Sequence, residues 1–132
     1  MNNLIIYIEA HKHQPMNFGN KIISHLRKHY KNNTLLDLDN FSAPDLFSHA
    51  LTACKEEQKI KLIIKVEEQE ITLGPILQFI NKLIRITSLS IDTVLIGEHL
   101  TLKRMLSKMN SFEECSSDAL IQKIKHKKTS LN

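Results

Sequence analysis

The chain has 132 residues, of which 42% are hydrophobic and 24% are charged, and its formal net charge is +4. This composition predicts a single globular domain over residues 1–132 and excludes a disordered chain or a small fold that depends on disulfides. The sequence contains no run of about 18–20 apolar residues that could cross a membrane and no signal-peptide pattern, so we expect a cytoplasmic protein.

The first predicted strand covers residues 4–8, and a polar loop over residues 10–20 leads from it into an amphipathic helix. The second strand is predicted over residues 34–38. Asp37 and Asp39, which we place on opposite faces of that strand, are interpreted as solvating and capping residues rather than as an acid–base pair.

A second helix is predicted to start at Ser42 and Pro44, because a capping hydroxyl followed by proline is typical of a helix N-terminus. Its inward stripe includes Cys54, which we interpret as a buried, unreactive thiol. Cys54 and Cys115 have neither disulfide-framework nor metal-ligand spacing, so both are expected to be reduced.

The third strand is predicted over residues 60–66, and an acidic connection leads from it to a helix over about residues 72–86. The fourth strand covers residues 91–96, and we identify no fifth strand directly after it. Helical spacing resumes at about residue 102, and Ser111 with Glu114 indicates the start of a last helix.

Strands that alternate with helices predict a three-layer α/β/α sandwich, with a mostly parallel sheet of four strands, or five. In such a sheet ligands bind beyond the carboxyl ends of the strands. The loop over residues 10–20 opens a helix at this edge, where backbone amides and the helix dipole favour an anion. This loop is therefore the first candidate for a ligand site.

The first strand ends in Ala10 and His11, and Asn17, Phe18 and Asn20 follow before the helix. In this respect the chain resembles the flavodoxin-like NAD(P)H quinone reductases, over about residues 4–97. The resemblance implies a flavodoxin-like fold with the strand order 2-1-3-4, reduction of a flavin by a nicotinamide donor, and an FMN phosphate held at His11, Asn17, Phe18 and Asn20.

The connection after the third strand departs from the family, because Glu67, Glu68 and Glu70 stand where the relatives pack the flavin ring with proline and aromatic residues. Several carboxylates close together disfavour an anionic cofactor. We therefore expect a divergent, non-catalytic domain without a cofactor, which acts through protein interaction or self-association. The alternative is a small FMN-dependent NAD(P)H quinone oxidoreductase. No catalytic residue is assigned.

We expect a homodimer through the third helix, because its apolar arc is wider than one buried stripe needs. The arc consists of Leu73, Ile76, Phe79, Ile80 and Leu83. A basic, flexible tail is expected from about residue 127, and we expect no nucleic-acid binding because no aromatic residues interleave with the basic ones. No metal site is predicted, since His11 and His13 alone make a weak ligand set.

Overall fold

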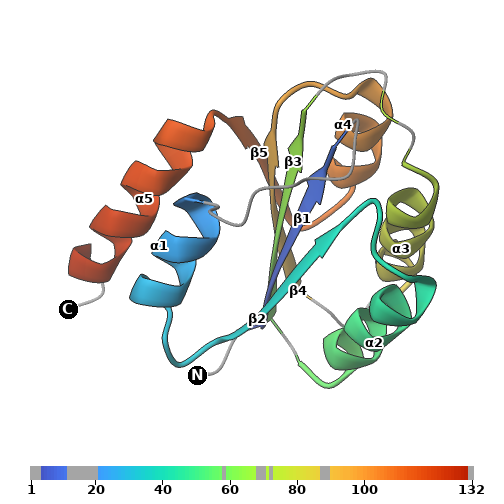
Figure 1. The fold of residues 1–132 in the computed structure, drawn as a ribbon, viewed down its shortest axis with the longest axis horizontal. Helices are drawn as coiled ribbons and strands as arrows, with labels where there is room; N and C mark the ends of the chain where they lie inside the picture. The colour runs from blue at the N-terminus through green and yellow to red at the C-terminus, as the bar shows by residue number, and fades with distance from the viewer. Residues whose placement is uncertain are drawn as a thin grey trace.

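The computed structural model describes residues 4–11, 21–57, 59–67, 71, 73–86 and 90–130, with side chains described as far as residue 125. Strands and helices alternate along this part of the chain (Figure 1). In order the elements are β1 (Leu4–Ala10), α1 (Lys21–His29), β2 (Thr34–Asp39), α2 (Pro44–Lys55), β3 (Lys59–Val66), α3 (Gly74–Ile84), β4 (Ser90–Ile96), α4 (Leu100–Leu106), β5 (Ser111–Cys115) and α5 (Ser117–Ser130).

The five strands form one parallel sheet in the order β2-β1-β3-β4-β5. The predicted order 2-1-3-4 is confirmed, and the fifth strand continues it at the β4 edge. This architecture is consistent with a flavodoxin-like α/β fold. The central strands are buried on both faces, which explains their continuous apolar sequences.

The segment Ser111–Cys115 is a strand, so the helix start that we predicted at Ser111 and Glu114 is wrong. Its backbone pairs with β4, and the Thr93 hydroxyl donates a hydrogen bond to the Ser111 carbonyl oxygen at 2.8 Å. The helix begins after Ser116 instead, whose hydroxyl oxygen accepts the backbone N–H of Ala119 at 3.1 Å. The pattern of a capping box was present, but pairing with β4 decided the conformation.

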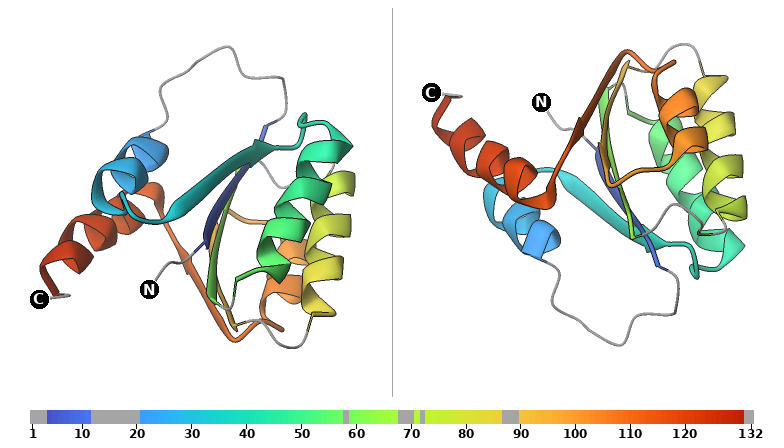
Figure 2. Two further views of the ribbon diagram at one scale, coloured as in Figure 1. Left: turned by 90° about the horizontal axis from the view of Figure 1, so that it is seen from below. Right: turned by 90° about the horizontal axis from the view of Figure 1, so that it is seen from above.

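Helices cover both faces of the sheet, with α2, α3 and α4 on one face and α1 and α5 on the other (Figure 2). Alternate residues of β1 therefore enter two separate hydrophobic clusters. Ile6 and Ile8 pack on the α2–α3–α4 side, whereas Ile5 and Tyr7 pack on the α1–α5 side. The three-layer sandwich predicted from the sequence is confirmed.

The apolar arc of α3 faces the inside of the molecule. All five residues on which we based the homodimer prediction are at most 3% exposed, because they pack against the sheet and α2. The arc therefore offers no free surface to a second copy, and the reason that we gave for a dimer through α3 does not hold. Whether the chain dimerises stays a prediction. The five residues are Leu73, Ile76, Phe79, Ile80 and Leu83.

Within the described residues, the structure contains no helix that is long and apolar enough to span a membrane.

Candidate functional site

The candidate site lies at the carboxyl ends of β1, β2 and β3. Strand order reverses next to β1, since the chain passes from β1 to β2 on one side and then returns to place β3 on the other. In doubly wound sheets this reversal separates the adjacent loops and leaves room for a ligand. The residues that follow these strands therefore determine what the edge can bind.

Of the four residues predicted to hold a phosphate, the structure describes His11. Asn17, Phe18 and Asn20 lie outside the described residues, as does most of the loop that we predicted as the ligand site. The description of the site consequently rests on His11 and on the residues around it from β1, β2 and β3.

The imidazole of His11 lies between two carboxylates. Its Nε2 is 3.4 Å from Glu9 Oε2, and its Nδ1 is 3.8 Å from Glu67 Oε2. The side chains of His11 and Glu9 are only 14% and 18% exposed, whereas that of Glu67 is 53% exposed. Among the described residues, both ring nitrogens thus lie near acidic groups.

The carboxylate of Glu9 is held by Tyr7 on the side of the core. The Tyr7 hydroxyl donates a hydrogen bond to Glu9 Oε1 at 2.7 Å, and the Tyr7 ring is fully buried against α1 and α5. A charge-assisted hydrogen bond of this length holds the carboxylate in place. Tyr7, Glu9 and His11 therefore form a connected polar group that rises from the core to the edge of the sheet.

Asn40 joins the end of β2 to the end of β1. Its side-chain oxygen accepts the backbone N–H of His11 at 2.8 Å, and its side-chain amide donates to the His11 carbonyl oxygen at 2.9 Å. This two-way contact satisfies both backbone polar groups of His11 just beyond the last strand residue. It fixes the position of the histidine independently of its ring.

Asp39 holds the turn over residues 39–42 and does not cap a helix. α2 begins at Pro44 after Ala43 without a side-chain cap, so the predicted capping by Asp39 and by the Ser42 hydroxyl is wrong, because both side chains bond within the turn. The Asp39 carboxylate accepts the backbone N–H of Phe41 at 2.8 Å and a hydrogen bond from the Ser42 hydroxyl at 3.3 Å. The Ser42 hydroxyl oxygen in turn accepts the Asp39 N–H at 2.9 Å. This arrangement leaves the Phe41 ring 45% exposed at the edge of the sheet.

Our placement of Asp37 and Asp39 on opposite faces of β2 was wrong, because strand residues two apart share a face. They stand in register with Tyr7 and Glu9, so three carboxylates gather on the α1 side of the sheet. Partial desolvation raises the pKa of Asp37, and the charges of Glu9 and Asp39 raise it further, against the opposing effect of Arg27. Lys65 of β3 stands in register with Glu9, so the described residues at this edge carry both signs of charge, with carboxylates in the majority.

Gly97 follows β4 with a φ of +98°, in the left-handed region that favours glycine. A Cβ at this position would lie 2.4 Å from the Val66 carbonyl oxygen at the end of β3. Gly97 is therefore required for the close approach of the ends of β3 and β4. This packing requirement explains the glycine without any cofactor.

The arrangement can bind cationic or hydrogen-bond-donating groups more readily than a phosphate, since its charged side chains are mostly carboxylates. Among the described residues no group of three His, Cys, Asp or Glu side chains could hold a metal ion. Neither described thiol supplies a nucleophile, because burial raises the pKa of Cys54 to about 12 and also raises that of the half-buried Cys115.

Sequence reasoning missed Tyr7, Glu9 and Asn40 as members of the site. Glu9 is the one charged residue in an otherwise apolar strand sequence, and that exception was the available signal. Asn40 gave no comparable signal, because its partner lies 29 residues away in the sequence. Parallel pairing of β1 with β2 brings the two together.

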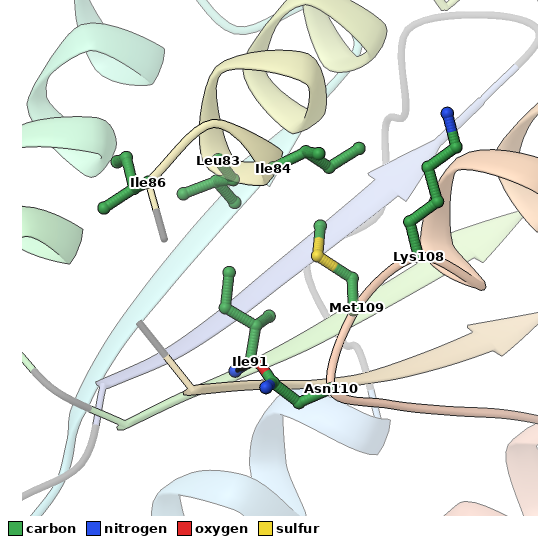
Figure 3. A pocket seen from close by; sticks show the side chains of 7 residues that line it. All are labelled: Leu83, Ile84, Ile86, Ile91, Lys108, Met109 and Asn110. Carbon is green, nitrogen blue, oxygen red and sulfur yellow. Dashed lines mark hydrogen bonds between the residues drawn. The ribbon is translucent and has the colours of Figure 1, made fainter. Parts of the chain in front are cut away.

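A separate cavity of about 340 Å³ lies at the opposite, amino edge of the sheet, between the end of α3 and the start of β4 (Figure 3). Ile84 and Met109 approach each other across it, above Ile91. It is distant from His11 and forms no part of the candidate site. The lining residues are Leu83, Ile84, Ile86, Ile91, Lys108, Met109 and Asn110.

A comparison of the chain with family models, with curated proteins and with solved structures finds no significant match.

Proposed function

We propose that the chain is a divergent flavodoxin-like domain of the cytoplasm that uses the carboxyl edge of its sheet for protein contacts and not for flavin chemistry. The observation that carries this proposal is the position of His11 between Glu9 and Glu67. A phosphate at this position would meet two carboxylates, and their repulsion outweighs the attraction of one imidazole. The resemblance to the quinone reductases then reflects the fold and not a working cofactor site.

Two exposed apolar side chains that follow the carboxyl end of β2 support a protein-binding role. Phe41 is 45% exposed and Leu46, in the first turn of α2, is 49% exposed. Aromatic and aliphatic side chains next to a charged rim are typical of protein interfaces. A matching partner presents apolar side chains, and a second copy of this chain, which can cover Phe41 and Leu46 with its own, is the first partner to test.

The alternative function is an FMN-dependent NAD(P)H quinone oxidoreductase. It is supported by the strand order, since flavodoxin-like sheets bind FMN at the switch point next to β1. In that case FMN would supply the redox chemistry, and the residues around His11 would position it.

The test measures self-association by sedimentation equilibrium, for the wild-type chain and for Leu46→Asp. We expect a concentration-dependent dimer that Leu46→Asp converts to monomer, because a buried carboxylate at the contact is costly. The matched control is Asn81→Asp on α3, which adds the same charge at an exposed residue away from the carboxyl edge of the sheet and should leave the dimer intact. A wild-type chain that stays monomeric, or equal effects of both variants, would contradict self-association through this surface.

Addition of FMN distinguishes the two functions. The proposed function predicts no change in melting temperature and no quenching of flavin fluorescence. A saturable rise in melting temperature that His11→Ala abolishes would establish the alternative, because a ligand that binds the native state stabilises it.

A further inference from the structure

The outer surface of the α1–α5 layer is basic. Residues 21–33 contain Lys21, Arg27, Lys28 and Lys31 and no acidic residue, and all four of these side chains are exposed. Basic residues in a last helical turn stabilise the helix dipole, which accounts for Arg27 and Lys28. It does not account for Lys21, which stands at the first residue of α1, where the dipole disfavours a cation.

The fold adds a second helix to this surface. α5 lies beside α1 on the same face of the sheet (Figures 1 and 2), and the two share a hydrophobic cluster. Both run from the carboxyl edge of the sheet towards the amino edge, so Lys123 and Lys125 lie in the same layer as the basic residues of α1. Lys123 pairs with Glu113 of β5, and Lys125 is exposed. The described part of α5 contributes one acidic residue, Asp118.

The basic surface suits a negatively charged partner, and the uncharged side chains around the lysine and arginine residues indicate which type of partner. The large hydrophobic side chains that are exposed in the described part of the chain are Phe41, Leu46 and Leu100, and none of them belongs to α1 or α5. Helices that lie on a membrane present apolar residues to the lipid, and protein interfaces have an apolar centre. A surface of cations and small polar groups instead matches the phosphates of nucleic acid.

We propose that the basic α1–α5 face binds the phosphate backbone of double-stranded nucleic acid without reading the bases. A duplex is favoured over a single strand because α1 and the described side chains of α5 present no exposed aromatic ring on which bases could stack. α1 is about 14 Å long, which matches roughly four base-pair steps and about three phosphate contacts. The sequence-based expectation of no nucleic-acid binding rested on the lack of aromatic residues among the basic ones, which is a criterion for single strands and not for a duplex backbone. The tertiary structure adds that α1 lies beside α5.

Fluorescence anisotropy with labelled DNA and RNA duplexes of about two helical turns tests this proposal. We expect binding at low salt, with a slope of log K against log salt of about −3. Lys28→Glu with Lys31→Glu should weaken binding at least about tenfold and make the slope shallower by about two. Circular dichroism and thermal melting verify that the variant is folded. The DNA and RNA arms identify which backbone geometry is preferred.

The matched control is Lys82→Glu with Arg85→Glu, which makes the same change in net charge at exposed residues on the other face of the sheet. It should weaken binding less than about threefold, through the long-range field alone. Equal losses in the two double variants would overturn the proposal, as would absence of binding to both duplexes at low salt. Tighter binding to a single strand, or to phosphatidylserine vesicles at matched salt, would also overturn it.

Discussion

His11 shows that the surroundings of a residue decide which groups its side chain contacts. In the sequence it follows a strand and precedes a helix, which is a position suited to phosphate binding. In the structure its ring is nearly covered and lies between Glu9 and Glu67, while Asn40 holds its backbone. The same side chain that could contact a phosphate instead lies beside carboxylates of its own chain.

Gly97→Ala is expected to destabilise the protein by about 2–4 kcal/mol, because a Cβ would clash with the Val66 carbonyl and the φ of +98° is strained for alanine. The free energy of unfolding from urea denaturation measures this. Gly74→Ala is the control, since nothing lies within 4 Å of a Cβ there and alanine favours the helix. A loss below about 0.5 kcal/mol at Gly97 would contradict the close strand approach.

The buried thiol of Cys54 makes the free energy of unfolding depend on pH in alkaline solution. Its folded pKa is raised to about 12 from an ordinary value of 9.0, so the unfolded chain loses the thiol proton first. The free energy of unfolding therefore falls between about pH 9 and pH 12, by at most about 1.4 kcal/mol per pH unit, and this contribution is constant below pH 9. Cys54→Ala should remove that part of the pH dependence in urea titrations, whereas the exposed Thr52→Ala should retain it.

At the scale of the element, α3 demonstrates that a wide apolar arc need not indicate a partner. The helix is covered by the sheet on one side and by α2 on the other, where Phe79 and Phe47 lie with ring centroids 5.8 Å apart. Two neighbouring elements together bury a wider arc than the sheet alone would. The remaining exposed residues of α3 are mainly polar, including Gln78, Asn81 and Lys82.

Phe79→Ala is therefore expected to lower the free energy of unfolding by about 3–5 kcal/mol, through loss of buried surface and creation of a cavity. Chemical denaturation followed by circular dichroism measures the change, and sedimentation of the folded fraction should show an unaltered oligomeric state. Gln78→Ala, on the exposed side of the same helix, should change stability by less than about 0.5 kcal/mol. An altered oligomeric state without loss of stability would restore α3 as a dimer surface.

Element prediction succeeded where the hydrophobic pattern was continuous and failed at β5. The strands β1, β3 and β4 are apolar over most of their length, and this pattern is difficult to mistake in a chain with alternating helices. The sequence of β5 contains two glutamates and a serine in five residues, so its strand character comes from pairing with β4 and not from its own pattern.

For the molecule as a whole, the fold separates charges that are mixed in the sequence. The carboxyl ends of β1, β2 and β3 collect Glu9, Asp37, Asp39 and Glu67, whereas the outer surface of α1 and α5 collects lysine and arginine. The net charge of +4 conceals this division. Leu46 of α2 and Lys28 of α1 lie on helices of opposite faces of the sheet, so variants at the two residues test the two proposals separately.

The layered architecture and the burial of the apolar stripes could be predicted from the sequence, because they follow from local periodicity and from the handedness of crossover connections, and the family resemblance added the order of the first four strands. The partners of polar side chains depend on the tertiary structure. Asn40 reaches His11 across 29 residues, Glu9 stands beside Asp39 through strand register, and α5 meets α1 across most of the chain. Hydrogen bonds and charges act over a few ångströms in space, and their effect depends on contacts that no local pattern in the sequence records.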